Sequence, residues 1–411
     1  TIASLKDTYK DVFPIVGVGA GIASILGKNG SEFISQQYNA VTPGNEMKPD
    51  AILGSTIGKL VKPTDEVSAD KTDFITVEDA KSMGYIIPDN YTSYDDNRFK
   101  SATGEYAVPR LNFDNVDKLM KAAHENGVKL RGHTLVWHQQ TPKYFFQQNY
   151  KITTGQKYNT SKECMDTRLE FYVKTVMNHV LSSEYADCLY SYDVVNEYLH
   201  SANAEKDSKN ITYWGLIYGT YDKSVKDHGV TLRPSYVKDA FKYAHEMLVK
   251  YDRLDVKLIY NDYNCYQNPE NIIHLVDYIN SDGKVCDGIG MQSHLDITDS
   301  FHSATNYAKA LEYFRLNCPD LEIQITELDA TMVSTEDKPL TDEDQAAYYD
   351  QIMNAILTNK KNGGNITALI IWSLYDGVSW RPAKFPCLFN GLYMPKAAFY
   401  AVIDAKKQYW D

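Results

Sequence analysis

The sequence has little of several features that would assign it to a class of protein at once. No apolar run approaches about 18 residues, so no membrane-spanning helix is predicted. No block is rich in Lys or Arg and the formal net charge is −12, which argues against nucleic acid and anionic membranes as partners. The six cysteines lack C-x-x-C spacing, so we expect no zinc site, and their number leaves the redox compartment open.

The composition is that of a large globular protein. A chain of 411 residues with 43% hydrophobic residues suits two or three average domains, but it equally suits one (β/α) barrel with insertions. Tyrosine is abundant, with 32 residues against 5 Trp. Aromatic rings stack on sugars, yet they also fill cores, so this excess is weak evidence for either role.

Runs of strand character alternate with segments of helical period along nearly the whole chain. Alternation repeated eight times predicts a parallel sheet with helical crossovers, and eight strands close a barrel. We therefore predict an α/β fold, a single (β/α)8 TIM barrel covering residues 1–411. The predicted strands are 14–20, 40–42, 129–136, 191–195, 257–260, 288–291, 322–325 and 367–372. The predicted helices are 31–38, 115–126, 168–181, 236–250, 271–279, 308–316, 342–357 and 397–409.

One long stretch interrupts this alternation. Residues 51–110 separate the second strand from its helix and are too many for an ordinary βα loop. The insertion lies on the carboxyl side of a strand, where barrel loops build active sites. It is equally compatible with a wall of a substrate groove and with a packed decoration that only stabilises the fold.

Two glutamates stand at the ends of predicted strands. Glu197 closes the run Asp193-Val194-Val195-Asn196-Glu197, and Glu327 follows Gln324-Ile325-Thr326. A single glutamate at such a place is ordinarily a solvated surface residue. Two carboxylates at the ends of separate strands are, however, what glycoside hydrolysis requires, because one donates a proton and the other attacks or activates water.

Chemistry-bearing side chains recur at the ends of seven predicted strands, which is the functional signature of a barrel. The amide, carboxylate, imidazole and indole groups at these ends are hard to ascribe to stability. They occur in the runs NEMK (45–48), HTLVWHQQ (133–140), DVVNE (193–197), NDYN (261–264), QSH (292–294), QITELD (324–329) and WSLYDGVSWR (372–381).

These runs, in this order, resemble glycoside hydrolase family 10, the endo-β-1,4-xylanases. The resemblance covers nearly the whole chain outside 51–110, and it implies an endo-acting hydrolase of β-1,4-xylan that retains anomeric configuration. It implies Glu197 as the acid/base and Glu327 as the nucleophile, with His294 holding Glu327 and Asn196 bonding the 2-hydroxyl of the sugar at subsite −1. Gln292 and Asp329 are expected to support this pair. The residues expected to bind substrate are Asn45, Lys48, His133, Trp137, His138, Gln140, Tyr263, Trp372, Trp380 and Arg381.

The sequence departs from the family inside one motif. Typical members carry Glu-Asn-Glu-Met-Lys after the second strand, whereas this chain has Gly44 before Asn45. The missing carboxylate removes a contact at subsite −2 and leaves room for an arabinosyl or glucuronosyl branch. Alternatively, Gly44 is a turn residue that needs a positive φ after Pro43.

The resemblance leaves rival hypotheses. A related retaining barrel acting on β-glucan or mannan shares the Asn-Glu and Glu motifs, and a non-catalytic carbohydrate-binding barrel would be expected to have lost one glutamate. A metal hydrolase would use His133 and His138, but their spacing on a strand places them on opposite faces. The glycine run 17–21 lacks the third glycine of a dinucleotide site.

No cofactor and no metal are expected for these roles. The sequence begins at Thr1 without a signal-peptide pattern, which a removed secretory signal or a trimmed chain would explain. We expect a secreted or cell-surface monomer, either alone or as one module of a larger protein, with xylan or xylo-oligosaccharide as its partner.

Overall fold

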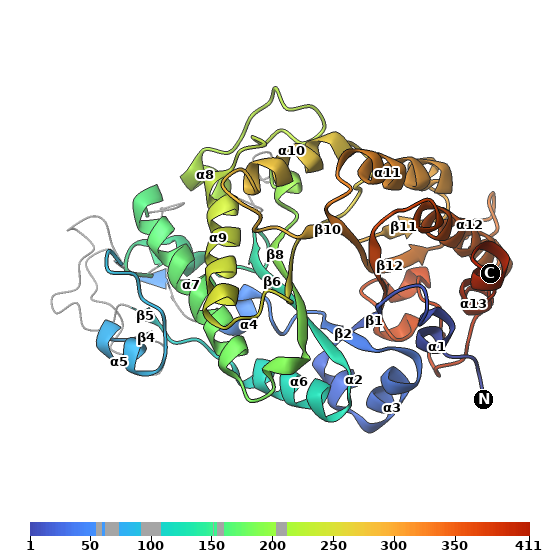
Figure 1. Ribbon diagram of the computed structural model, residues 1–411, viewed down its shortest axis with the longest axis horizontal. Coiled ribbons are helices and arrows are strands. Elements are labelled where there is room, and N and C mark those ends of the chain that lie inside the picture. The colour runs from blue at the N-terminus through green and yellow to red at the C-terminus, as the bar shows by residue number, and fades with distance from the viewer. Residues whose placement is uncertain (55–59, 62–73, 92–107, 151, 154–159, 203–211) are drawn as a thin grey trace.

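A computed structural model of the chain describes residues 1–54, 60–61, 74–91, 108–150, 152–153, 160–202 and 212–411 (Figure 1). Its centre is a closed ring of eight parallel strands in the order β1-β2-β6-β8-β9-β10-β12-β13, with β13 pairing back onto β1. This confirms the predicted barrel and all eight predicted strands. The strands are β1 Ile15–Ala20, β2 Ala40–Pro43, β6 Lys129–Trp137, β8 Leu189–Asn196, β9 Lys257–Asp262, β10 Gly288–Met291, β12 Glu322–Thr331 and β13 Ile366–Trp372.

Helices surround the strands, as Figure 1 shows, and each predicted helix is present. Their apolar faces are buried against the barrel, so the 3.6-residue period of the sequence marks the face that touches the strands. The predicted helices correspond to α3 Lys28–Gln37, α6 Asp114–Glu125, α7 Lys162–Ser182, α9 Ser235–Lys250, α10 Pro269–Ile279, α11 Ala304–Asn317, α12 Asp342–Lys361 and α13 Ala397–Tyr409.

The prediction missed several short elements. Five helices of five or six residues span fewer than two turns, so the apolar period does not repeat within them and the sequence does not mark them. They are α1 Leu5–Tyr9, α2 Ile22–Leu26, α4 Pro49–Leu53, α5 Val77–Ser82 and α8 Tyr213–Tyr218. Three further pairings involve β3 Leu60–Val61 with β7 Ile152–Thr153, β4 Phe74–Ile75 with β5 Val108–Pro109, and β11 His294–Asp296 with β12.

The described parts of the insertion 51–110 pack against the outside of the barrel. Tyr85 and Tyr91 lie against Phe171 on α7, with ring centroids 6.1 and 5.7 Å apart. The Tyr85 hydroxyl accepts the backbone N–H of Leu111 at 2.8 Å, and Phe74 packs against Tyr144. These contacts favour the stabilising role for this part of the insertion; Tyr94 and Tyr106 lie outside the described residues.

Two close contacts involve the first strand, β1, and the two ends of the chain. Gly19 on β1 has no side chain because the Trp372 ring occupies that space: a Cβ there would lie 2.1 Å from a ring carbon. At the chain ends, α1 and α13 lie side by side (Figure 1), and the Tyr9 hydroxyl donates to the Val402 carbonyl at 2.6 Å.

Candidate active site

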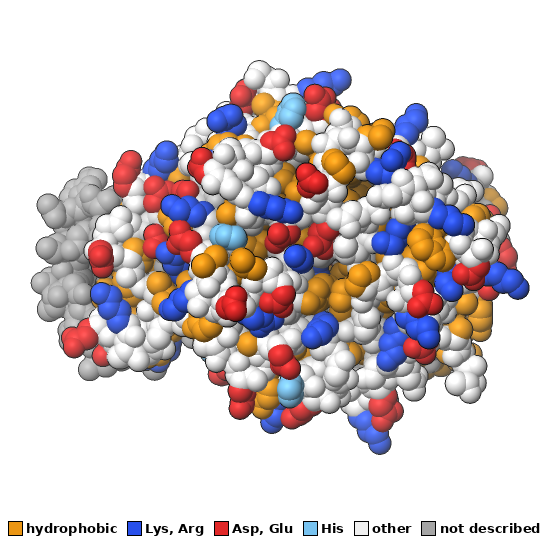
Figure 2. Space-filling model, in the orientation of Figure 1, with side chains coloured by type: hydrophobic (Ala, Val, Ile, Leu, Met, Phe, Trp, Pro, Cys, Tyr) orange, Lys and Arg blue, Asp and Glu red, His pale blue; other side chains and the backbone are white. Residues whose placement is uncertain are grey.

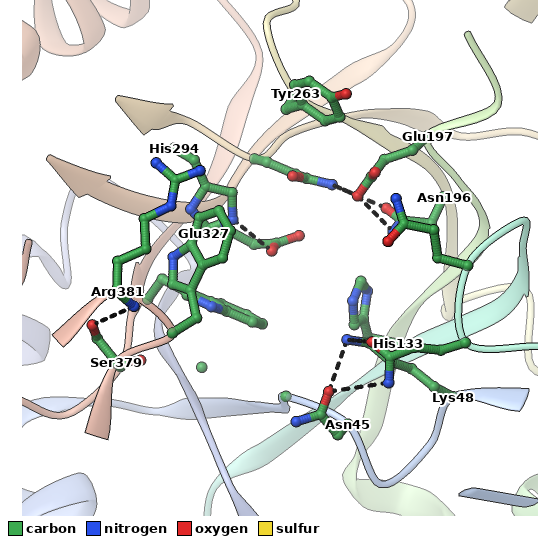
Figure 3. Close-up of a pocket in the computed structure, with 18 of the residues that line it drawn as sticks. Asn45, Lys48, His133, Asn196, Glu197, Tyr263, His294, Glu327, Ser379 and Arg381 are labelled. Atoms are coloured by element: carbon green, nitrogen blue, oxygen red, sulfur yellow. Dashed lines mark hydrogen bonds and ion pairs between the residues drawn. The ribbon is translucent and has the colours of Figure 1, made fainter. Parts of the chain in front are cut away.

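The carboxyl ends of the barrel strands open into one pocket with a volume of about 830 Å³ (Figure 3). Most of the residues predicted for the site line it, although they come from seven strands spread over more than 300 positions of sequence. These are Asn45, Lys48, His133, Trp137, Gln140, Asn196, Glu197, Tyr263, Gln292, His294, Glu327, Trp372, Trp380 and Arg381.

Glu197 occupies the first position after β8, in a left-handed backbone conformation with φ of 60°. Its backbone N–H donates to the Asn261 carbonyl at 2.8 Å, which holds this uncommon conformation in place. Its carboxylate accepts hydrogen bonds from Gln292 Nε2 at 2.9 Å and Asn196 Nδ2 at 3.1 Å. Burial, with the nearby negative charge of Asp262 added, raises the pKa of Glu197 to about 7 despite these bonds.

Glu327 projects from the middle of β12 into the same pocket, and only 5% of its surface is exposed. Burial alone would raise its pKa, but hydrogen bonding and the positive charge of His294 outweigh it and lower the pKa to about 2. His294 Nε2 lies 3.0 Å from one carboxylate oxygen, and Asn261 Nδ2 donates to the other at 2.8 Å.

His294 is held by a second carboxylate. Its Nδ1 lies 2.8 Å from Asp329, whose other oxygen accepts the indole N–H of Trp380 at 2.8 Å. Burial opposes the charged imidazole, but Asp329 and Glu327 together raise the pKa of His294 to about 10. Both ring nitrogens therefore donate, and an imidazolium sits between two carboxylates.

The two glutamates are joined by a chain of amides. Asn261 Nδ2 contacts both Glu327 and the Asn196 side-chain carbonyl, at 2.8 and 3.0 Å. Gln292 Nε2 then donates to that same carbonyl at 3.1 Å as well as to Glu197. Because every member is hydrogen-bonded, the network fixes the direction of both carboxylates.

A cationic group faces the pair from β2. Lys48 Nζ donates to Asn45 at 3.0 Å and to Gln140 at 3.1 Å, and it lies 4.9 Å from the centre of the Trp137 ring. Burial lowers the pKa of Lys48, while the charges of Glu327 and Glu197 act in the opposite direction. Figure 3 shows this group on the side of the pocket away from Arg381.

His133 is oriented from beneath by a buried ion pair. Its Nδ1 lies 2.7 Å from Asp193, and Arg131 pairs with the same carboxylate through both guanidinium nitrogens. Arg131 also donates to Gln324 at 2.8 Å. The carboxylate thus fixes the ring of a pocket-lining imidazole from below.

Some predicted residues lie elsewhere, and some site residues were missed. Asp329 acts behind the pocket through His294, and His138 is half-buried near Asp262 and His200, where burial lowers its pKa to about 4. Neither lines the pocket, so direct substrate binding by His138 is not what the structure favours. Asn261 was included only within the run NDYN and was not predicted as a site residue, and no sequence pattern indicated His302.

The structure also corrects one interpretation of Gly44. Its φ is not in the positive region that favours glycine, so a turn does not require glycine there. Gly44 lines the pocket, and a Cβ at this position would meet only the Ala20 carbonyl oxygen, at 3.9 Å. The space beside it is therefore open, as the alternative interpretation requires.

One carboxyl group that keeps its proton to about pH 7 and another that is ionised above about pH 2 form an acid and a nucleophile from the same residue type. Placed at the carboxyl ends of barrel strands, such a pair defines a two-carboxylate glycoside hydrolase. A family profile described as glycosyl hydrolase family 10 matches residues 4–405. The chain belongs to this family, and the family prediction is confirmed.

Individual relatives agree with this assignment. The chain is 40% identical to endo-1,4-beta-xylanase A of Butyrivibrio fibrisolvens over 90% of its own length and 77% of that protein. Among solved structures it resembles a Clostridium thermocellum xylanase complexed with xylohexaose, with a TM-score of 0.71, 27% identity, and coverage of 98% of this chain and 67% of that one.

A second solved structure is a glutamate-to-alanine mutant of the intracellular xylanase of Thermoanaerobacterium saccharolyticum with xylotetraose. It matches with a TM-score of 0.69 and 25% identity over 98% of each chain. The chain spans about a third of the length of several other curated relatives.

Proposed function

We propose that this protein is an endo-1,4-β-xylanase that hydrolyses xylan with retention of anomeric configuration. The observation that carries the proposal is the pair Glu197 and Glu327, which share one pocket and are held in opposite protonation states by different surroundings. Family membership supports the substrate class, since endo-1,4-beta-xylanases are among the relatives. Both glutamates are retained, which argues against a purely binding role.

In the first step, the ionised Glu327 carboxylate attacks the anomeric carbon as Glu197 donates its proton to the glycosidic oxygen. The bond to the leaving xylan segment breaks and a covalent glycosyl-enzyme forms. In the second step, the Glu197 carboxylate takes a proton from water. The water oxygen then attacks the same carbon, releasing Glu327 and giving a product with the original β configuration.

The remaining pocket residues take binding roles in this proposal. Asn196 is turned toward Glu197, and we assign it to the 2-hydroxyl of the sugar that is attacked. Lys48, with Asn45 and Gln140, presents polar groups on one side of the pocket. The walls on which sugar rings stack are Trp137, Trp372 and Trp380, with Tyr263 on another side.

Product stereochemistry tests the mechanism. Proton NMR of early hydrolysis should show the β-anomer first, and the Glu197 and Glu327 carboxyl groups should lie about 5–5.5 Å apart in an experimental structure. Initial release of the α-anomer would refute retention.

Comparison of substrates tests specificity and mode of attack. Reducing-sugar release should be far greater from xylan than from carboxymethylcellulose or mannan. The viscosity of a xylan solution should fall early, because internal cleavage shortens chains faster than removal of end units. Faster hydrolysis of a β-glucan than of xylan would contradict the proposed substrate but not the assignment as a glycoside hydrolase.

We further propose that the protein acts outside the cell or at its surface as a monomer, alone or as one module of a longer polypeptide. The supporting argument is that polymeric xylan does not cross a membrane, and several relatives are about three times as long as this chain. Activity measured in culture supernatant against lysate tests the location, and light scattering after size exclusion tests the oligomeric state. Activity confined to the lysate would contradict the first proposal.

A further inference from the structure

Arg381 is a cation at the pocket edge whose charge is not used within the described part of the protein. Its backbone is anchored, because its N–H donates to Ser379 Oγ at 3.0 Å and its carbonyl accepts from Lys384. Its guanidinium makes no hydrogen bond or ion pair with any described residue, although the whole chain carries a net charge of −12. Lys48, a lysine that also lines the pocket, by contrast donates hydrogen bonds to Asn45 and Gln140.

The guanidinium is nevertheless held in one place. Its central carbon lies 3.9 Å from the centre of the Trp380 ring, the separation of a stacked cation–π pair. Trp380 is itself fixed, because its indole N–H donates to Asp329 at 2.8 Å and its ring lies 4.6 Å from that of His294. The stack therefore connects Arg381 to the network that holds Glu327, and Figure 3 shows Arg381 at the rim of the pocket on this side.

A second basic group lines the pocket within electrostatic range. His302 presents an imidazole to the pocket, with Nδ1 accepting the Asp296 N–H at 2.8 Å and Nε2 lying 3.7 Å from Asp299, beyond hydrogen-bond distance. Burial lowers the pKa of His302, the charges of Asp299 and Asp296 act in the opposite direction, and the positive charge of Arg381 lowers it. An anion bound beside Arg381 would remove this repulsion.

We propose that Arg381, with His302 lining the same pocket, forms a subsite for the carboxylate of a uronosyl branch on the xylan chain. This inference rests on the proposed xylanase function. A neutral xylosyl backbone offers no group that matches a planar, permanently charged fork, whereas a carboxylate accepts two parallel N–H bonds from it. Stacking on Trp380 leaves the edge of the guanidinium, where these donors lie, open to the ligand.

The experiment compares glucuronoxylan with the same polymer after chemical reduction of its carboxyl groups to alcohols. The measured quantity is the ratio of kcat/KM on the acidic polymer to kcat/KM on the reduced one. In the unmodified enzyme this ratio should exceed one and fall as NaCl is added, because salt screens the ion pair. Arg381→Met, which keeps an apolar stem, should lower the ratio about tenfold, as expected for loss of a charge-assisted bond.

Two further variants separate the fork from charge alone. Arg381→Lys should give an intermediate ratio, because a point charge replaces the fork. Lys384→Met removes an exposed cation three residues away that does not line the pocket, so its ratio should equal that of the unmodified enzyme. An equal ratio in Arg381→Met and the unmodified enzyme would overturn the subsite, whatever the absolute rates.

The same data separate this inference from the proposed function. An enzyme that hydrolyses both polymers with equal kcat/KM retains its xylanase function and lacks the subsite. An enzyme that cleaves neither polymer nor linear xylohexaose is not a xylanase.

Discussion

At the scale of single residues, the chemistry depends on two glutamates whose ordinary pKa values are alike and whose surroundings are not. Burial, together with the negative charge of Asp262, favours the neutral form of Glu197 against the opposing hydrogen bond from Gln292. Glu327 faces an imidazolium that a second carboxylate keeps charged. The difference between their pKa values therefore arises in their neighbours.

The pH profile should report this difference. Glu327, with its lowered pKa, is active when ionised, above about pH 2, and Glu197 is active when protonated, below about pH 7. The value of kcat/KM should therefore fall as pH rises through about 7. In His294→Gln the positive charge is lost, the pKa of Glu327 rises, and the acidic limb should move to higher pH by at least one unit. An acidic limb that stays in place in this variant would show that His294 does not control Glu327.

Azide rescue should separate the roles of the two glutamates. Glu327→Ala leaves no nucleophile, so activity should fall at least about 10⁴-fold, and azide entering from the vacated face should give the α-glycosyl azide. Glu197→Ala still forms the glycosyl-enzyme from substrates with good leaving groups, and azide should then give the β product. Identical stereochemistry from both variants, read by NMR, would contradict the assignment.

Gly44 should affect specificity for branches. A Cβ at this position makes no close contact and the backbone does not require glycine, so Gly44→Glu should fold normally while its side chain extends into the pocket. We expect kcat/KM on arabinosyl- or glucuronosyl-branched xylan to fall about tenfold relative to linear xylohexaose, from steric exclusion together with a new hydrogen bond to the linear chain. An unchanged ratio between the two substrates would mean that the open space has no role in specificity.

At the scale of elements, register irregularities in three strands determine the direction in which side chains of the site point. Register shifts occur between Ile325 and Leu328 where β12 pairs with β13, and between Asp193 and Val195 where β8 pairs with β9. A third lies between His133 and Val136, where β6 pairs with β8. Such irregularities redirect side chains locally. Each one falls within a few residues of a group that faces the pocket, and this explains how one long strand presents both core and site residues.

The helix that follows β12, α12, has an N-cap whose contribution to stability can be measured. The Thr341 hydroxyl accepts the Asp344 N–H at 3.3 Å, and the Asp344 carboxylate accepts the Thr341 N–H at 2.8 Å, which together form a capping box. Thr341→Ala should lower the free energy of unfolding by about 1 kcal/mol, measured by urea denaturation, with kcat unchanged. Thr305→Ala, an exposed threonine in the first turn of α11, should change it by less than about 0.5 kcal/mol. An equal decrease in the free energy of unfolding of the two variants would contradict a stabilising role for the Thr341 cap.

At the scale of the whole molecule, the surface matches a neutral or weakly charged polymer better than a polyanion. The overall charge is −12, and on the face shown in Figure 2 acidic and basic side chains are interspersed. Among the described residues, no helix is long and apolar enough to cross a bilayer, and no cluster of three metal-ligating side chains is present. All six cysteines are buried.

Every step of the proposed mechanism is assigned to a side chain, so chelation should not affect activity. After exhaustive EDTA treatment and dialysis, kcat/KM on xylan and the Tm should both remain within error of the untreated enzyme. Loss of activity without a change in Tm, restored by a divalent cation, would indicate a metal in the reaction. A drop in Tm that the cation reverses would indicate a metal that stabilises the fold.

The architecture and most of the pocket residues can be predicted from the amino-acid sequence alone. Strand and helix periods are local properties of the chain, so the eight strands and eight helices follow from them, and parallel strands in a closed barrel bring their carboxyl ends together. Short helices such as α2 and α8 carry too few residues to show a period. The position of Glu197 directly after a strand was readable without coordinates, whereas β12 continues past Glu327 to Thr331.

The contacts between the site residues, in contrast, depend on how the strands are arranged in the folded protein. Asn261 on β9 bridges Asn196 on β8 and Glu327 on β12 because the ring order is β8-β9-β10-β12, and no pattern in the sequence gives these distances. The left-handed backbone of Glu197 and the displacement of His138 from the pocket likewise depend on neighbouring strands. The pKa of each glutamate is set by burial and by charges from other strands, which form only when the barrel closes.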